Sequence, residues 1–146
     1  MPPFQPTNPD YDAAVRRLFA AQHLVSLYGV ALTEIVPGRV VLDLQPDARL
    51  TQQQGRIHGG VIGAVADTAG GFAALTLMPP GSDVVTVEYK INFMRGASGL
   101  LRTTGEVIRP GKTITVVRMT CECGTAGRLE TCAVVQATFM RVAALA

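Results

Sequence analysis

The sequence predicts an α+β domain in which one long helix packs against one antiparallel β-sheet. Residues 57–78 form an apolar stretch, rich in Gly and Ala, as long as about six helical turns. Short segments rich in β-branched residues flank this stretch, two before it and four after it. Gly- and Pro-containing turns separate the segments. Two strands, one long helix and four further strands are typical of an α+β architecture with a single sheet.

The composition indicates one globular domain over residues 1–146, large enough to bury a core. Hydrophobic residues make up 48% and charged residues 16%, which excludes a disordered chain. The formal net charge is +2 and no basic run occurs, so no nucleic-acid partner is expected. Residues 1–10 lack the basic start and apolar core of a signal peptide. We therefore expect a cytoplasmic protein.

Several elements are expected before the long helix. Four prolines oppose regular structure in the first residues, and Asp10 is a good helix-capping residue. Pro37-Gly38 is a turn signal between two β-branched runs. The predicted order is a flexible arm over 1–9, a helix from about Tyr11 that frays at 23–29, a hairpin of strands 30–36 and 39–44, and a polar loop over 46–55.

The long helix is predicted to be buried rather than held by intrinsic propensity. Its five glycines each cost about 0.5–1 kcal/mol of helix stability relative to Ala, so tertiary packing must hold it. A membrane span has the right length, but Asp67 near the centre would cost roughly 2.5–3.5 kcal/mol to insert. Pro79-Pro80-Gly81 ends the helix. A central helix that touches its neighbours closely is the better interpretation, and no membrane partner is expected.

Four strands are expected after the helix, in a meander whose place in the sheet the pattern leaves open. In the first of them, apolar residues alternate with polar ones, which predicts a half-buried antiparallel strand. The alternation puts Thr86 on the face opposite Val85, Val87 and Tyr89. The predicted strands cover residues 84–94, 100–108, 113–123 and 129–141.

The sequence lacks the motifs that several other chemistries require. Residues 105–113, GEVIRPGKT, miss the phosphate-loop spacing by one residue and precede a strand rather than a helix. No serine lies in a nucleophile elbow. Cys121 and Cys123 share a strand face and match neither a redox nor a zinc motif, so the cysteines are interpreted as buried thiols. With two histidines in the chain, no metal site is expected.

Two features of the long helix carry chemistry. Its first N–H groups, at Gly59 and Gly60, have no partner within the helix and favour a ligand oxygen. Asp67 is a carboxylate in an apolar helix, which indicates either function or a structural hydrogen bond. Gly59 and Asp67 lie about 12 Å apart at about 1.5 Å of rise per residue. If both act on one substrate, two subunits must supply them.

Gln52-x-x-Gly55-x-x-His58-Gly59-Gly60, followed by Asp67, resembles the signature of hotdog-fold acyl-CoA thioesterases. The resemblance is to the phenylacetate-degradation type, related to the 4-hydroxybenzoyl-CoA thioesterases, and covers about residues 24–140. It implies a long helix wrapped by an antiparallel sheet. It also implies a homodimer that pairs its sheets and shares its sites, and a homotetramer built from such dimers.

The resemblance also implies roles for particular residues. The Gly59 N–H polarises the thioester carbonyl with help from Gln52, and Asp67 of the partner chain activates water that Thr86 orients. Gln accompanies Glu more often than Asp in this family, so the mixed pair Gln52 and Asp67 leaves the substrate subtype open. His58 either acts in the chemistry or shapes the turn into the helix.

Coenzyme A is part of the expected acyl-CoA substrate, and no separate cofactor is expected. Gly60, Arg109 and Lys112 are the candidates for contacting it, although Arg109 and Lys112 also fit a solvated turn. Direct attack by Asp67, through an anhydride, remains open beside general-base catalysis. The rival functions are a non-catalytic acyl-CoA-binding protein and, less well supported by the Asp and His spacing, a hydratase. The acyl group stays open.

Overall fold

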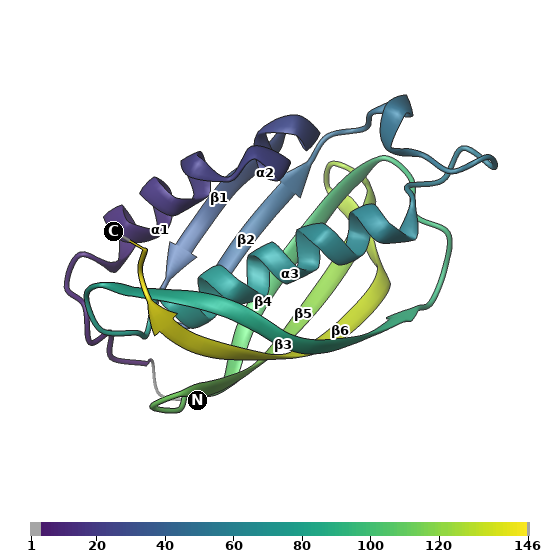
Figure 1. Cartoon of the computed structure of the whole chain (residues 1–146). Helices are drawn as coiled ribbons and strands as arrows, with labels where there is room; N and C mark the ends of the chain where they lie inside the picture. Colours follow the sequence, from purple (N-terminus) through teal and green to yellow (C-terminus); the bar gives the residue numbers. More distant parts are fainter. Residues whose placement is uncertain (1–3, 146) are drawn as a thin grey trace.

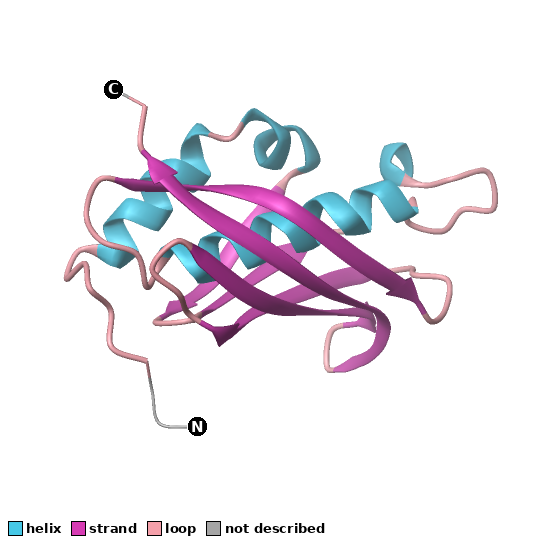
Figure 2. Cartoon of the chain, turned by 60° about the horizontal axis from the view of Figure 1, so that its bottom comes forward, coloured by secondary structure: helices cyan, strands magenta, loops and turns pink. Residues whose placement is uncertain are grey.

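A computed structural model describes residues 4–145. One antiparallel sheet curves round the long helix α3, and the short helices α1 and α2 lie beside the sheet edge at β1 (Figures 1 and 2). The predicted α+β arrangement is confirmed. The elements are α1 (Tyr11–Ala21), α2 (His23–Tyr28), β1 (Val30–Val36), β2 (Arg39–Leu44), a 3₁₀ turn (Ala48–Leu50), α3 (Gly59–Leu75), β3 (Ser82–Phe93), β4 (Leu100–Arg109), β5 (Ile114–Thr125) and β6 (Arg128–Ala143).

The strand order is β1-β2-β4-β5-β6-β3, and all neighbours are antiparallel. The predicted meander of four strands is therefore wrong for β3, which pairs with β6 at the edge of the sheet instead of with β4. The loop 94–99 carries the chain from this edge to the middle of the sheet. On its way the Ala97 carbonyl accepts a hydrogen bond from the Ile57 N–H, just before α3. Alternation along a strand specifies its faces but not its neighbours.

Helix α3 is shorter than predicted, although the chain stays coiled beyond its end. The N–H groups of Leu77 and Met78 bond to carbonyls three residues back, which tightens the last turn. Close contacts explain the small residues of the helix. A Cβ on Gly105 of β4 would lie 2.5 Å from the Ala69 carbonyl oxygen, so the strand and the helix backbone touch. Within residues 4–145, no helix combines the length and the apolarity that a membrane crossing requires.

The N-terminal segment differs from its prediction in two respects. His23–Tyr28 form the short helix α2, which is followed by Gly29 with φ +71°, whereas a frayed turn was predicted over 23–29. Residues 4–9 lack helix and strand, but Phe4 packs on Gly38 and the Thr7 hydroxyl donates to the Leu77 carbonyl at 2.9 Å. The rest of the expected flexible arm, residues 1–3, lies outside the described residues. Asp10 precedes α1 but makes no side-chain capping bond.

Candidate active site

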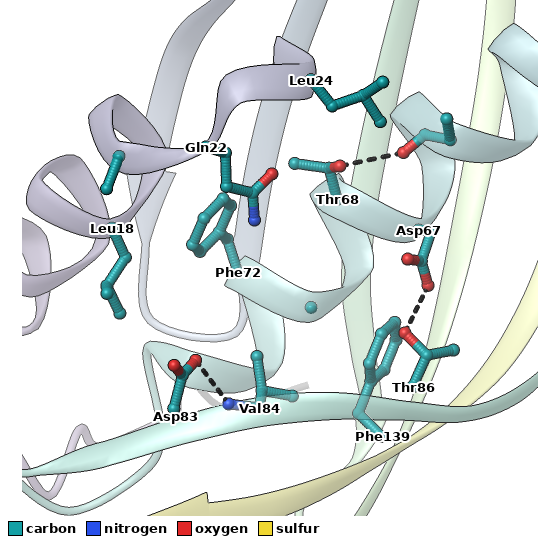
Figure 3. Close-up of a pocket in the computed structure, with 13 residues that line it drawn as sticks. Leu18, Gln22, Leu24, Asp67, Thr68, Phe72, Asp83, Val84, Thr86 and Phe139 are labelled. Carbon is teal, nitrogen blue, oxygen red and sulfur yellow. Dashed lines mark hydrogen bonds between the residues drawn. The ribbon is translucent and has the colours of Figure 1, made fainter. Parts of the chain in front are cut away.

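Asp67 lies in the middle of α3, half-buried among residues that are almost all buried. Its carboxylate accepts a hydrogen bond from the Thr86 hydroxyl of β3 at 2.7 Å (Figure 3). Burial raises the pKa of Asp67 because it disfavours the charged form, and the Thr86 hydrogen bond offsets part of this rise. A carboxylate with a raised pKa beside a pocket can act as a proton acceptor.

A β-bulge places Thr86 beside Asp67. The register between β3 and β6 shifts between Thr86 and Glu88, so the faces of β3 exchange there. Before the shift, Thr86 faces α3. After the shift, Tyr89 and Phe93 face α3, since their side chains would lie 3.1 and 3.0 Å from a Cβ built on the nearest glycine of that helix. Simple alternation predicted Thr86 on the face opposite Tyr89, and this prediction is wrong because of the bulge.

The N-terminal end of α3 leaves one N–H group without a partner among residues 4–145. His58 caps the helix: its Nδ1 accepts from the Gly60 N–H at 2.8 Å, and its carbonyl accepts from Val61 and Ile62. Among the described residues no partner is found for the Gly59 N–H. Gly59 is therefore the free donor at this end, whereas the Gly60 N–H is engaged. The hydrogen bond from the Gly60 N–H to the His58 ring is the one expected if His58 shapes the turn into the helix.

Gln52 lies in the loop that leads to this helix end. Its amide oxygen accepts from the backbone N–H groups of Gln54 and Arg56, and its Nε2 donates to the Gln54 side chain at 3.1 Å. The His58 N–H donates to the Leu50 carbonyl at 2.9 Å, which holds the loop against the start of α3. The structure thus places Gln52 on the loop that enters α3 at the Gly59 end, with its amide oxygen engaged within its own turn.

One chain holds the predicted residues in two separate groups. Asp67 and Thr86 form one group, and Gln52, His58 and Gly59 belong to the start of α3. Gly59 and Asp67 are both on α3, eight residues apart, which corresponds to about 12 Å along the axis. A single chain therefore does not bring the carboxylate to the free N–H.

Arg109 and Lys112 lie at the opposite end of α3 from Gly59. Arg109 ends β4, and Lys112 lines a small hollow of about 220 Å³ with Leu77 and Met78, just beyond the helix. Both cations are exposed. Binding phosphate and solvating a turn both stay predictions for these two residues.

Sequence motifs did not indicate the residues that form a pocket beside Asp67. This pocket measures about 390 Å³ and lies between α3, β3 and the junction of α1 with α2 (Figure 3). A signal was present in the sequence: the pair Gly70-Gly71 follows Asp67 in a helix that glycine destabilises. The large apolar residues that line the pocket are Leu18, Leu24, Phe72, Val84 and Phe139.

The three cysteines are free and buried, as predicted. Burial raises the pKa of Cys121 to about 11 and that of Cys132 to about 12, so both remain protonated thiols at neutral pH. Such thiols are poor nucleophiles and poor metal ligands. Among the described residues, no three His, Cys, Asp or Glu side chains lie close enough to hold a metal ion.

Comparisons of the chain with known proteins agree on one family. A family model described as the thioesterase superfamily matches residues 54–129. A protein of Saccharolobus solfataricus described as a candidate esterase is 33% identical over 73% of this chain and 76% of its own length. The 1,4-dihydroxy-2-naphthoyl-CoA hydrolase of Listeria monocytogenes is 28% identical over 60% of this chain and 72% of its own length.

A solved structure supports the same assignment. The thioesterase family protein from Silicibacter pomeroyi is 36% identical, covers 91% of this chain and 98% of its own, and has a TM-score of 0.89. The chain therefore belongs to the thioesterase superfamily, and its fold is the hotdog fold that the resemblance predicted.

Proposed function

We propose that the protein hydrolyses acyl-CoA thioesters to a free acid and coenzyme A. The observation that carries the proposal is the Asp67–Thr86 pair: a half-buried carboxylate with a raised pKa, which lines a pocket in a thioesterase-superfamily chain. The related hydrolase from Listeria monocytogenes is named for a CoA thioester, which supports coenzyme A as the carrier.

In the proposed reaction Asp67 takes a proton from water, and the hydroxide attacks the thioester carbonyl carbon. The carbon–sulfur bond then breaks, and coenzyme A leaves as a thiol after taking up a proton. A general base typically contributes about 10²–10⁴-fold. The Gly59 N–H, at the positive end of α3, donates to the developing oxyanion, and such a donor is typically worth about 2.7–4 kcal/mol. Attack by Asp67 itself, through an anhydride, is the alternative route.

Two subunits complete each proposed site. The separation of about 12 Å along α3 is too long for one chain's Asp67 and Gly59 to act on one carbonyl. β3 is an edge strand of 12 residues, and most of its apolar side chains are exposed, with Val87 and Phe93 each 54% exposed. Such an edge is a ready surface for pairing. Pairing β3 of two chains antiparallel brings Asp67 of each to Gly59 of the other, and homotetramers of these dimers remain a prediction.

Arg109 and Lys112 are proposed to bind the phosphates of coenzyme A. Antiparallel α3 helices place the C-terminal end of one helix beyond the N-terminal end of the other. The Arg109–Lys112 turn lies at the C-terminal end of α3, so these cations of one chain extend past Gly59 of its partner. Arginine and lysine are common phosphate ligands. Gly60 contributes through the absence of a side chain, because its N–H is bound to His58.

Gly59 offers a sharp test. It is the first residue of α3, where proline is tolerated, and His58 before it is extended, with φ −61° and ψ 134°, as a residue before proline prefers. Gly59→Pro therefore removes the N–H and keeps the helix. Gly59→Ala is the matched control, because it keeps the N–H while its Cβ also meets the Phe93 ring, at 3.0 Å.

The assay is thiol release from a panel of acyl-CoAs, followed with a colorimetric thiol reagent. We expect turnover by the wild type, and kcat about 10²–10³-fold lower for Gly59→Pro than for Gly59→Ala. Equal kcat values would remove the Gly59 N–H from the mechanism. Tight acyl-CoA binding without thiol release would instead support the rival function, a non-catalytic acyl-CoA-binding protein.

A further inference from the structure

The pocket beside Asp67 has the size of an acyl site rather than of a site for the whole substrate. Its volume of about 390 Å³ is near the lower end of the roughly 300–1,000 Å³ typical of small-molecule pockets. Figure 3 shows Asp67 and Thr86 at one side and Leu18 and Asp83 at the other, with Phe72 between them. The cavity therefore extends away from the carboxylate, toward the junction of α1 and α2.

Gly71 occupies a special position in this pocket. It lies four residues after Asp67, so both residues are on the same face of α3. A Cβ on Gly71 would lie 3.5 Å from Phe139 and 3.6 Å from Val84, which are ordinary contact distances between pocket residues. Alanine would fit here and would also favour the helix. The packing of α3 therefore does not require glycine at this position. Because Gly71 has no side chain, it leaves space in the pocket.

Gly70, the preceding residue, has the opposite character. A Cβ on Gly70 would lie 2.7 Å from the Met119 sulfur and 2.9 Å from the Phe139 ring, closer than a folded core permits. Gly70 is therefore required for the contact between α3 and the sheet, and it does not line the pocket. The two adjacent glycines form a natural pair, one needed for packing and one that opens space.

The far wall of the pocket comes from the N-terminal helices. α1 ends at Ala21, Gln22 is extended, and α2 begins at His23, so the chain turns beside the pocket. Leu18 and Leu24 line it from either side of this turn, and Leu24 is 42% exposed. This wall consists of side chains on two short helices, outside the sheet.

We propose that Gly71 determines which acyl groups the enzyme accepts. The missing side chain leaves room, one helical turn from Asp67, for an acyl group that is broad next to its carbonyl, such as a ring or a branched chain. Leu18 and Leu24 limit how far that group extends. This inference rests on the proposed function, because it takes the pocket beside Asp67 as the acyl site.

The test compares benzoyl-CoA with acetyl-CoA as substrates. One methyl group in a tight apolar pocket changes kcat/KM by about 10–200-fold, so Gly71→Ala should lower the benzoyl-to-acetyl ratio of kcat/KM by at least about 10-fold. Gly127→Ala is the control: it adds the same methyl group where nothing lies within 4 Å, outside the pocket, and its φ of +86° disfavours alanine. It should lower Tm and leave the ratio near its wild-type value. A ratio that Gly71→Ala does not change, or that Gly127→Ala changes equally, overturns the proposal.

Leu18→Ala tests the far wall with the opposite sign. It should raise kcat/KM for naphthoyl-CoA relative to benzoyl-CoA, and an unchanged ratio would remove α1 from the acyl site.

The preference for benzoyl-CoA over acetyl-CoA is also measured as binding, by calorimetry, in chains that carry Asp67→Asn. If neither acyl-CoA binds, the proposed function fails. If both bind and Gly71→Ala leaves their relative affinities unchanged, this inference fails while the proposed function stands.

Discussion

Replacing Asp67 with Asn separates the catalytic role proposed for this residue from a structural one. Asn keeps the shape of the side chain and an oxygen that accepts the Thr86 hydrogen bond, now 2.7 Å long. It cannot take a proton from water or attack a thioester. We expect turnover to fall about 10²–10⁴-fold, the usual contribution of a general base. A purely structural acceptor would instead leave turnover almost unchanged.

The same substitution should stabilise the fold at neutral pH. Burial raises the pKa of Asp67 above its value in the unfolded chain. The protonated Asp67 carboxyl therefore contributes stability to the folded chain. This contribution is fully present below the pKa that Asp67 has in the unfolded chain, and it is lost as the pH rises through the pKa that it has in the folded chain. At pH 7 only the wild type carries the cost of a partly buried charge. Because the side chain remains partly exposed, we expect Asp67→Asn to add about 0.5–1 kcal/mol to the free energy of unfolding.

The assay combines thiol release at pH 7 with thermal unfolding from pH 8 down to pH 4.5. A gain of this size corresponds to a Tm about 1–4 °C higher than that of the wild type at pH 7. The gain should shrink as the pH falls, because the wild-type carboxyl then takes up its proton. A lower Tm for Asp67→Asn at pH 7 would show that the carboxylate stabilises the fold, and would refute the reasoning for a functional charge.

Two further predictions concern the residues around the proposed site. Thr86→Val removes the hydrogen bond that lowers the pKa of Asp67, so the acid limb of kcat/KM against pH should move to higher pH; an unmoved limb would contradict the role of the pair. Arg109→Ala and Lys112→Ala should raise KM for acyl-CoA more than they lower kcat, since remote phosphate contacts hold substrate and transition state alike. Equal losses on an acyl-pantetheine, which lacks the nucleotide, would show that these cations do not bind it.

The local elements could be predicted from the sequence because their signals are local. The hairpin 30–36 and 39–44 has the predicted bounds, since β-branched runs flank a Pro-Gly turn. The central helix follows from its composition, and its ends shift by two or three residues because His58 caps it and its last turn tightens. The pairing of β3 with β6 could not be predicted, because residues far apart in the chain determine it.

The residues of the candidate site could be proposed from the sequence, but their geometry could be predicted only in part. The motif identified Asp67 and the start of α3, and the resemblance added Thr86. Alternation misplaced Thr86, because a bulge depends on the partner strand and leaves no mark in the regular pattern of residues 84–93. The pocket was missed because Leu18 and Phe139 come from distant elements, and only the fold brings them to Asp67.

Subunit complementation tests the proposed shared site most directly. We expect chains with Asp67→Asn and chains with Gly59→Pro each to retain very little turnover alone. The two are mixed in equal amounts after reversible dissociation. Half of the dimers are then mixed, and each mixed dimer has one intact site of two, so activity should return to about one quarter of wild type. Mixtures that stay inactive although subunit exchange is demonstrated would contradict a site divided between Asp67 of one chain and Gly59 of the other.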